Sequence, residues 1–267
     1  MIVKFSIVAN IKQENIREIL EKVIGFIDDF ELDAESAKSL GLNGVEIKDL
    51  TGDVIISLGG DGTILHILSQ INKPILGINF GGVGFLNELE PDDDIYAAIY
   101  NVINNKYYEE KLHRIDTYVN NLNVGTAVNE IVLHTSRVAK IQGFEISTNG
   151  KLIDSFRGDG VIIATPTGST SYSMSVGAPI IYPTMKSNII VPIAAYKLGS
   201  RPLVLPSDFD ISAKITGHPE AIMVLDGKEE IFIKGEDKLE FKASKSPASL
   251  IRFKKNFFDR LRNKLRL

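Results

Sequence analysis

A short segment with three glycines around one aspartate carries the clearest chemistry in this sequence. The apolar run 53–58 leads directly into Gly59-Gly60-Asp61-Gly62-Thr63, and a helical pattern follows. Glycines let phosphate groups approach the backbone, and the start of a helix offers free N–H groups to an anion. Thr63 could cap that helix or donate its hydroxyl to a phosphate. A tight turn with an incidental aspartate explains fewer of these glycines, so the segment predicts a phosphate-binding turn.

Asp61 is the unusual member of this turn, because a carboxylate beside an anion site is repulsive. It has a role there only if it takes a proton from a hydroxyl group or holds a metal ion, and the residues leave both roles open. The sequence has no GxxxxGK[ST] segment, and Gly60 and Gly62 lack the third glycine of GxGxxG. Two better-known phosphate-binding motifs are therefore excluded.

Two further polar segments could bind a ligand. Arg157-Gly158-Asp159-Gly160 leads into an apolar strand, and Thr167-Gly168-Ser169-Thr170-Ser171-Tyr172 follows it. This hydroxyl-rich run can present donors to a polar ligand, with Tyr172 available to stack on a base. The alternative is a serine- and threonine-rich loop that caps a helix. Asn129-Glu130 ends a strand-like run, and in isolation such a pair usually only faces solvent.

The elements that position the first turn follow an alternating pattern. Strands are expected over 2–8, 53–58 and 74–78, and helices over 14–30, over 63–70 and after Pro91. Apolar strands separated by helices are typical of a parallel sheet with helices on both faces. After about residue 106 the segments become short and often alternating, as in 117–122, 124–128, 141–147, 211–216 and 229–234. They indicate a mostly antiparallel β domain.

The last segment, 251–267, has seven basic residues and one acidic residue, Asp259, a local charge of +6 in a chain of net charge −4. One interpretation is a tail that binds an anionic surface or nucleic acid. The favoured one is a closing helix with Phe257, Phe258, Leu261 and Leu265 packed on the first domain. The predicted domains are therefore 1–105 (α/β), 106–250 (β-rich) and the segment 251–267.

Composition excludes several classes of function. The 267 residues include no cysteine, which excludes disulfides, thiolate metal sites and a cysteine nucleophile. The net acidity argues against a nucleic-acid partner, and no export signal or membrane-length apolar run is expected. The four histidines, His66, His113, His134 and His218, are scattered and predict no metal site. We expect a soluble, cytoplasmic protein.

Four motifs occur in one order: 59–63, Gly81-Gly82-Val83-Gly84-Phe85-Leu86, Asn129-Glu130, and 158–160 running to 167–172. Together they resemble the NAD kinase family over nearly the whole chain. The first motif alone is shared with diacylglycerol and sphingosine kinases. Many members have Ser and Ala where Thr167 and Ser171 stand.

The resemblance implies a Rossmann-like N-terminal domain and a β-sandwich-like C-terminal domain, with the C-terminal segment returning to the first. It implies phosphoryl transfer from ATP, or in some members polyphosphate, to the 2′-hydroxyl of the adenosine ribose of NAD. Mg²⁺ would arrive with the triphosphate rather than at a protein metal site. The enzyme would be a homodimer or homotetramer.

The resemblance also assigns roles to residues of this chain. Asp61 would be the catalytic carboxylate, and no histidine lies near it in sequence to act as base. The turn residues Gly59, Gly60, Gly62 and Thr63 would surround the phosphates. Asp159 would contribute to a site across the subunit interface. The remaining residues expected to bind NAD are Phe85, Asn129, Glu130, Thr167, Thr170, Ser171, Tyr172, Ser175 and Asp226.

Two other functions remain as alternatives. A lipid kinase built on the same glycine-rich turn would need a membrane-facing entrance, for which the basic C-terminal segment is the candidate. A non-catalytic NAD(P) sensor would keep the pocket without turnover. The presence of Asp61 argues against the sensor, because a pure binder gains nothing from a carboxylate beside phosphates.

Overall fold

The chain forms two separate cores in the computed structural model, which describes residues 3–80, 84–228 and 230–265. Unit 1 combines residues 1–111 with 248–267, and unit 2 is formed by residues 112–247. The sequence predicted domain boundaries at 105/106 and 250/251, and these remain predictions.

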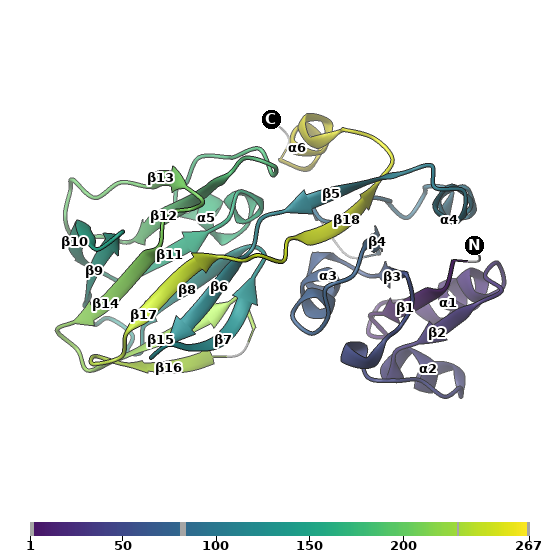
Figure 1. Cartoon of the computed structure of the whole chain (residues 1–267), viewed down its shortest axis with the longest axis horizontal. Coiled ribbons are helices and arrows are strands. Elements are labelled where there is room, and N and C mark those ends of the chain that lie inside the picture. Colours follow the sequence, from purple (N-terminus) through teal and green to yellow (C-terminus); the bar gives the residue numbers. More distant parts are fainter. Residues whose placement is uncertain (1–2, 81–83, 229, 266–267) are drawn as a thin grey trace. The chain divides into compact units, whose positions relative to one another are not determined.

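Unit 1 is built on one sheet whose strand order is β2-β1-β3-β4-β18-β5 among the described residues. The pairs β2–β1, β1–β3, β3–β4 and β4–β18 are parallel. Figure 1 shows β18 next to β4 in this sheet, although the two strands are far apart in the sequence. The strands are β1 (Phe5–Ala9), β2 (Phe30–Leu32), β3 (Val54–Leu58), β4 (Ile75–Ile78), β5 (Tyr108–Leu112) and β18 (Ala248–Arg252).

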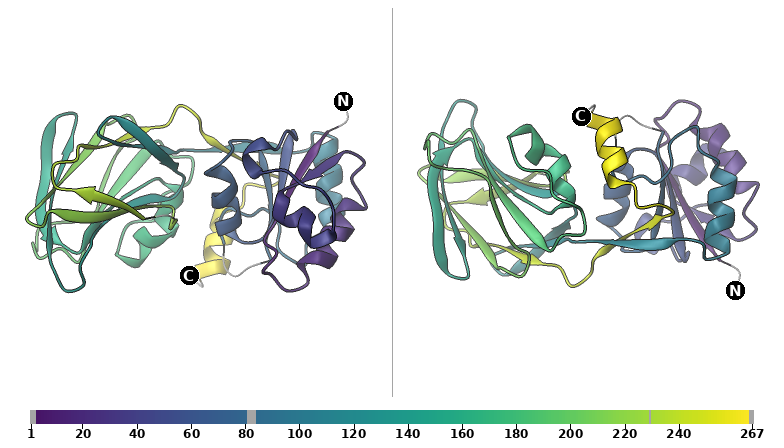
Figure 2. Two further views of the ribbon diagram at one scale, coloured as in Figure 1. Left: turned by 90° about the horizontal axis from the view of Figure 1, so that it is seen from below. Right: turned by 90° about the horizontal axis from the view of Figure 1, so that it is seen from above.

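Helices cover both faces of this sheet because alternate strand residues point to opposite sides. Leu20 of α1 (Ile16–Ile24) and Ile99 of α4 (Ile95–Ile103) share a core with Ile7 and Ile56 on one face. On the opposite face lies α3 (Asp61–Leu68), as Figure 2 shows. The other helical elements of unit 1 are α2 (Ala34–Leu40), the 3₁₀ turn η1 (Ile47–Asp49) and α6 (Phe257–Leu265).

Unit 2 is a sandwich of two antiparallel sheets that face each other in Figure 2. One sheet has the order β10-β9-β14-β17-β6-β7, and the other has the order β13-β12-β11-β8-β15-β16. Phe144 and Phe241 from the first sheet pack with Leu133 and Val161 from the second in one fully buried core. The strands of the first sheet are β6 (Ile115–Val119), β7 (Leu122–Ala127), β9 (Gln142–Thr148), β10 (Lys151–Gly158), β14 (Ile211–Thr216) and β17 (Leu239–Ala243). Those of the second are β8 (Glu130–Thr135), β11 (Gly160–Ala164), β12 (Ser187–Ile193), β13 (Leu203–Pro206), β15 (Glu220–Leu225) and β16 (Glu230–Lys234). The short helices η2 (Thr167–Thr170) and α5 (Tyr172–Ser175) follow β11.

The predicted fold class, an α/β domain followed by a β-sandwich-like domain, is confirmed. Some element boundaries were wrong. The helix expected over 14–30 ends at Ile24, because Gly25 follows and Phe30 begins β2. The short elements β2 and α2, which follow this helix between residues 30 and 40, were missed. Among the described helices, none combines the length and the apolar character that a membrane span requires.

Helix α6 is where the C-terminal segment departs most from expectation. It begins at Phe257, but Phe258 is 69% exposed and no described residue of the helix is buried. The expected packing is therefore wrong for Phe258, whereas Phe257, Leu261 and Leu265 are partly exposed. Three of the basic residues of the segment, Arg252, Arg260 and Lys264, pair with carboxylates of unit 1.

The carboxylate of Glu31 on β2 joins three parts of unit 1. It accepts hydrogen bonds from the Ser6 hydroxyl at 2.7 Å, from Gly52 N at 2.8 Å and from the Lys4 ammonium at 3.0 Å. The Thr51 N–H also donates to it. Burial raises the pKa of Glu31, but these donors outweigh burial and lower the pKa to about 2. The carboxylate thus holds the segment that enters β3 against β1 and β2.

We expect Glu31→Gln to lower the free energy of unfolding at pH 7 by about 1–3 kcal/mol, the range for hydrogen bonds to a charged group. The folded pKa lies below the ordinary value of 4.5. This stabilisation is therefore complete above about pH 4.5 and is lost as the pH falls towards 2. Urea unfolding at pH 7 and pH 3 measures it. Glu21→Gln, which breaks an exposed pair with Arg17, is the control. Equal losses of unfolding free energy in the two variants would contradict the stabilising role of the Glu31 carboxylate.

Candidate functional site

The glycine-rich turn connects β3 to α3, as expected, but the helix begins earlier than the sequence indicated. Asp61 is the first residue of α3 and Gly60 is its N-cap. Thr63 therefore lies inside the first turn, and its expected role as the helix cap is wrong. Its alternative role, donating a hydroxyl to a phosphate, stays a prediction.

The glycines of this turn are required for different reasons. A Cβ on Gly59 would collide with the Thr63 side chain, so packing demands glycine there. A Cβ on Gly62 would meet no atom within 4 Å in the described part of the chain. Because no described residue fills the space beside position 62, the small size of glycine leaves room for a ligand.

The Asp61 carboxylate is held by a second segment of unit 1. Oδ2 accepts the Phe85 N–H at 2.6 Å, and Oδ1 accepts the Leu86 N–H and the Asn87 Nδ2 at 3.0 Å each. A Cβ on Gly84 would collide with the same carboxylate. A carboxylate has about four lone-pair sites, so these three donors leave about one for a further partner. Asp61 is therefore fixed in direction and still able to accept a hydrogen bond.

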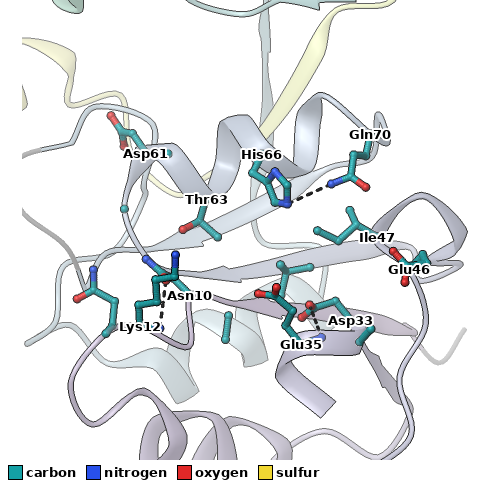
Figure 3. Close-up of a pocket in the computed structure, with 16 residues that line it drawn as sticks. Asn10, Lys12, Asp33, Glu35, Glu46, Ile47, Asp61, Thr63, His66 and Gln70 are labelled. Carbon is teal, nitrogen blue, oxygen red and sulfur yellow. Dashed lines mark hydrogen bonds between the residues drawn. The ribbon is translucent and has the colours of Figure 1, made fainter. Parts of the chain in front are cut away.

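A polar cavity of about 900 Å³ opens in front of this turn. Figure 3 shows its charged and polar lining, which comes from the segments that follow β1 and β3, from α3, and from the starts of α2 and η1. Ligands of open parallel sheets bind at the edge formed by the carboxyl ends of the strands. The labelled lining residues are Asn10, Lys12, Asp33, Glu35, Glu46, Ile47, Asp61, Thr63, His66 and Gln70.

Several lining residues were missed by the sequence analysis. Asn10 and Lys12 directly follow β1, and β1 pairs in parallel with β3. The rule that carboxyl ends of parallel strands meet at one edge could have identified them. The statement that no histidine lies near the turn was wrong, because His66 is on α3 and lines the cavity. Its ring Nε2 lies 3.2 Å from Gln70 Nε2.

In unit 2, a second aspartate binds a run of backbone N–H groups. Asp226, in a turn after β15 with φ of 49°, accepts from Val128 N at 2.8 Å, Asn129 N at 2.7 Å and Glu130 N at 3.1 Å. Its own N–H donates to the Glu130 carbonyl at 3.0 Å. The carboxylate expected to reach the dinucleotide is thus engaged in holding Asn129-Glu130 in place.

Glu130 is a buried acid of unit 2 with a raised pKa. Its side chain is buried at 5% exposure, and Oε1 accepts the Ser171 hydroxyl at 3.1 Å. Burial, followed by repulsion from Asp226, raises the pKa of Glu130 to about 7 although hydrogen bonds from Ser171 and Tyr172 lower it. Its other oxygen, Oε2, is buried and has no hydrogen-bond partner among the residues that the structure describes. Leaving a buried acceptor without a hydrogen bond is unfavourable, so this oxygen is suited to accept a hydrogen bond from a ligand hydroxyl.

The hydroxyl-rich run lies next to this pair. The structure brings together Asn129 and the segment that contains Thr165, whose N–H donates to the Asn129 carbonyl at 2.9 Å. Gly168 is required by packing, because a Cβ there would collide with the Asn129 backbone. Thr167 is buried and its hydroxyl has no hydrogen-bond partner within the ranges 3–80, 84–228 and 230–265, whereas Tyr172 is 40% exposed.

The other predicted residues are placed as follows. Thr170 donates to the Thr167 carbonyl, and Ser175 is exposed at the end of α5. Asp159 lies between β10 and β11, where its N–H donates to the Ile193 carbonyl. Phe85 belongs to unit 1, and Gly81-Gly82-Val83 lies outside the described residues. In the ranges 3–80, 84–228 and 230–265, no three His, Asp or Glu residues group in a way that could hold a metal ion.

Comparison with known proteins gives matches over both units. Residues 5–107 match the ATP-NAD kinase N-terminal domain, and residues 128–253 match the ATP-NAD kinase C-terminal domain. The chain is 39% identical to the NAD kinase of Thermoplasma volcanium over 234 residues, covering 87% of this chain and 86% of that protein. It is 39% identical to the NAD kinase of Methanosarcina mazei over 257 residues, covering 94% and 88%.

Two solved structures are also similar. The NAD kinase of Archaeoglobus fulgidus in complex with ATP has a TM-score of 0.80 at 28% identity and covers 98% of each chain. Yeast NADH kinase in complex with NADH has a TM-score of 0.88 at 23% identity, covers 99% of this chain and 88% of that chain, and shows the shared fold. The resemblance inferred from the four motifs is thereby confirmed. This chain belongs to the NAD kinase family, the enzymes that phosphorylate NAD with ATP.

Proposed function

We propose that this chain transfers the terminal phosphoryl group of ATP to the 2′-hydroxyl of the adenosine ribose of NAD, and that Asp61 accepts the proton of that hydroxyl. The observation that carries the proposal is the Asp61 carboxylate, fixed by three donors at the edge of a polar cavity and in the glycine-rich turn 59–63. Incubating the protein with NAD, Mg²⁺ and either ATP or polyphosphate tests it. NADP must form with ATP, and its absence from folded protein would reject the proposal.

The role of Asp61 follows from the chemistry of phosphoryl transfer. The protein contributes mostly positioning and charge stabilisation, together with a group that orients or deprotonates the attacking hydroxyl. A ribose hydroxyl is a poor nucleophile near neutral pH. A positioned general base contributes about 10²–10⁴ in rate, and the remaining lone pair of Asp61 supplies the acceptor.

The cavity of unit 1 supports a role as the donor site. The N-terminal turn of α3 and the open space at Gly62 suit the phosphates, and Lys12 adds a positive charge to the lining. Mg²⁺ would neutralise charge on the phosphate oxygens when bound. The described residues fit a cation carried by the triphosphate, because Mg²⁺ prefers phosphate oxygens, waters and few protein carboxylates, and no three-residue ligand group is present among them.

The polar residues of unit 2 support a role in binding NAD. Glu130 Oε2 is a buried acceptor to which no described residue donates, and a sugar hydroxyl is a donor of the right chemistry. Asn129, Thr167, Thr170, Ser171, Tyr172 and Ser175 complete this part of the proposal, with Phe85 as an adenine contact. Asp226 acts by holding the 128–130 backbone.

The proposal extends to the cellular form of the enzyme. We place it in the cytoplasm as a homodimer or homotetramer, with Asp159 contributing to a neighbour's site. The absence of cysteine is compatible with a reducing compartment.

Asp61→Asn should lower kcat by about 10²–10⁴, because an amide cannot accept the proton. The Km for NAD should change little, since removing a negative charge beside phosphates does not weaken binding electrostatically. Coupled assay of NADP formation measures both constants. In Asp61→Asn the amide NH₂ would also face one of the N–H groups that now donate to the carboxylate, so one hydrogen bond is lost as well. Asn87→Ala is the control, because it removes one of these hydrogen bonds and keeps the carboxylate. Its kcat should fall far less than that of Asp61→Asn. Unchanged kcat in Asp61→Asn would show that Asp61 is not the base.

Gly62→Ala should leave the thermal stability unchanged or slightly raised, because its methyl meets no protein atom and alanine favours a helix by about 1 kcal/mol over glycine. The Km for ATP should rise about tenfold or more if phosphates approach this backbone. Gly59→Ala should instead destabilise the fold through its collision with Thr63. A wild-type Km for ATP in Gly62→Ala would contradict the proposal that the phosphates bind at this turn.

Glu130→Gln should separate stability from binding. The folded pKa of about 7 exceeds the ordinary value of 4.5, so the native form binds the proton more tightly. Wild-type stability therefore falls as the pH rises from about 4.5 to 7, and the variant at pH 8 should be about 1–3 kcal/mol more stable. Its Km for NAD at pH 8 should rise about tenfold or more.

The wild-type Km for NAD should also rise as the pH falls below 7, because protonation removes the acceptor. Glu220→Gln, at an exposed position on β15 in the same sheet, is the control for general charge effects. A pH-independent Km in the wild type would contradict the role of Glu130.

A further inference from the structure

The C-terminal helix α6 is attached to the Asp61-binding segment through charges. None of its described residues is buried. The side chains of Arg260 and Lys264 are nevertheless only 11% and 12% exposed, and they pair with Glu88 and Glu90. By contrast Arg262 is 66% exposed and pairs with Asp259 on the helix surface. The side of this helix that faces Glu88 and Glu90 is therefore cationic.

These cations bind the carbonyl groups of residues 84–87, which form the segment that holds Asp61. The Lys264 ammonium donates to the Gly84 carbonyl, and Arg260 Nη1 donates to the Phe85 carbonyl at 3.3 Å. Arg252 on β18 donates to the carbonyls of Leu86 at 2.9 Å and Asn87 at 3.0 Å. Lys264 also lies over the Phe85 ring, 5.9 Å from its centre.

The same two peptide groups connect the cations to Asp61. The Gly84 carbonyl and the Phe85 N–H belong to one planar peptide group, and the Phe85 carbonyl and the Leu86 N–H belong to the next. Both N–H groups donate to the Asp61 carboxylate. A cation on a carbonyl polarises the peptide and strengthens the hydrogen bond that its N–H donates. Lys264 and Arg260 thus act on Asp61 through one peptide group each.

We propose that Lys264, together with Arg260, is a positioning residue for Asp61, acting through the peptide groups of residues 84–86. The proposal rests on the role of Asp61 as base given above. It assigns a function in catalysis to a helix about 200 positions further along the chain. A displacement of about 1 Å in a reacting group can cost about 10²-fold in rate, so a small relaxation of this segment is enough to matter.

Lys264 is the better of the two residues to test. Removing Arg260 would leave the Glu88 carboxylate, which is 4% exposed, with one cationic partner fewer inside the protein. The partner of Lys264, Glu90, is 48% exposed and can be solvated by water. Lys264→Met keeps the length of the stem and removes only the charge, so its effect is not confused with a buried unpaired acid.

We expect Lys264→Met to lower kcat about tenfold while the Km values for ATP and NAD stay within about twofold. Lys264→Arg should restore most of the rate, because it returns a cation to the Gly84 carbonyl. Arg262→Met on the same helix is the matched control and should keep the wild-type kcat. Thermal unfolding of each variant establishes that the comparison is made on folded protein. An increase confined to the Km for ATP would overturn the proposal, since Lys264 would then bind the nucleotide itself.

A double-mutant cycle with Asp61→Asn decides whether Lys264 acts through Asp61. If it does, Lys264→Met should cause little further loss of kcat in the Asp61→Asn background. A full tenfold loss in that background would overturn the positioning role while leaving Asp61 as base. A wild-type kcat in Asp61→Asn alone would instead reject the role of Asp61, so the two failures are distinguishable.

Discussion

In each unit an aspartate carboxylate binds backbone N–H groups of a distant segment, and the candidate sites depend on these interactions. Asp61 accepts from Phe85 and Leu86, and Asp226 accepts from Val128, Asn129 and Glu130. Backbone N–H groups in irregular segments need acceptors, and a carboxylate accepts several at once. One side chain thereby fixes both its own direction and the path of a loop that carries ligand-binding groups.

The two aspartates nevertheless do different work. The Asp61 carboxylate lines an open cavity and keeps about one acceptor position for a substrate hydroxyl. Asp226 accepts three backbone N–H groups of residues 128–130 and places a second negative charge near Glu130. Burial and that repulsion raise the pKa of Glu130 to about 7, and its Oε2 has no hydrogen-bond partner among the described residues. The buried Glu130 carboxyl group thus lowers the stability of the free protein locally, and the proposed dinucleotide would supply the hydrogen bond that Oε2 lacks.

The C-terminal segment extends the same principle to the carbonyl side of the backbone. Strand β18 joins the sheet of unit 1 beside β4, and Arg252 at its end reaches the carbonyls of Leu86 and Asn87. On helix α6, Arg260 and Lys264 bind the carbonyls of Phe85 and Gly84. A net basic segment, which in isolation suggests a tail for an anionic surface, therefore places three of its cations against backbone carbonyls of its own unit.

The sequence alone was sufficient for the fold class and for the chemistry of the main motif. The change from alternating strands and helices to short alternating strands reflects local burial patterns, and Gly59-Gly60-Asp61-Gly62-Thr63 is contiguous. Local information also explains the errors there: β2 has three residues, too few for a recognisable period, and Gly60 caps α3 without a side-chain signal.

What only the tertiary structure decided is which distant residues meet. Nothing in the spacing of Lys12 and His66 from Asp61 shows that they line one cavity, because that depends on the pairing of β1 with β3. Asp226 and residues 128–130 are nearly 100 positions apart, and Lys264 and Gly84 are 180 apart. The pattern of a helix reports which side chains share a face, but the sequence carries no comparable signal for a charge that binds a distant backbone carbonyl.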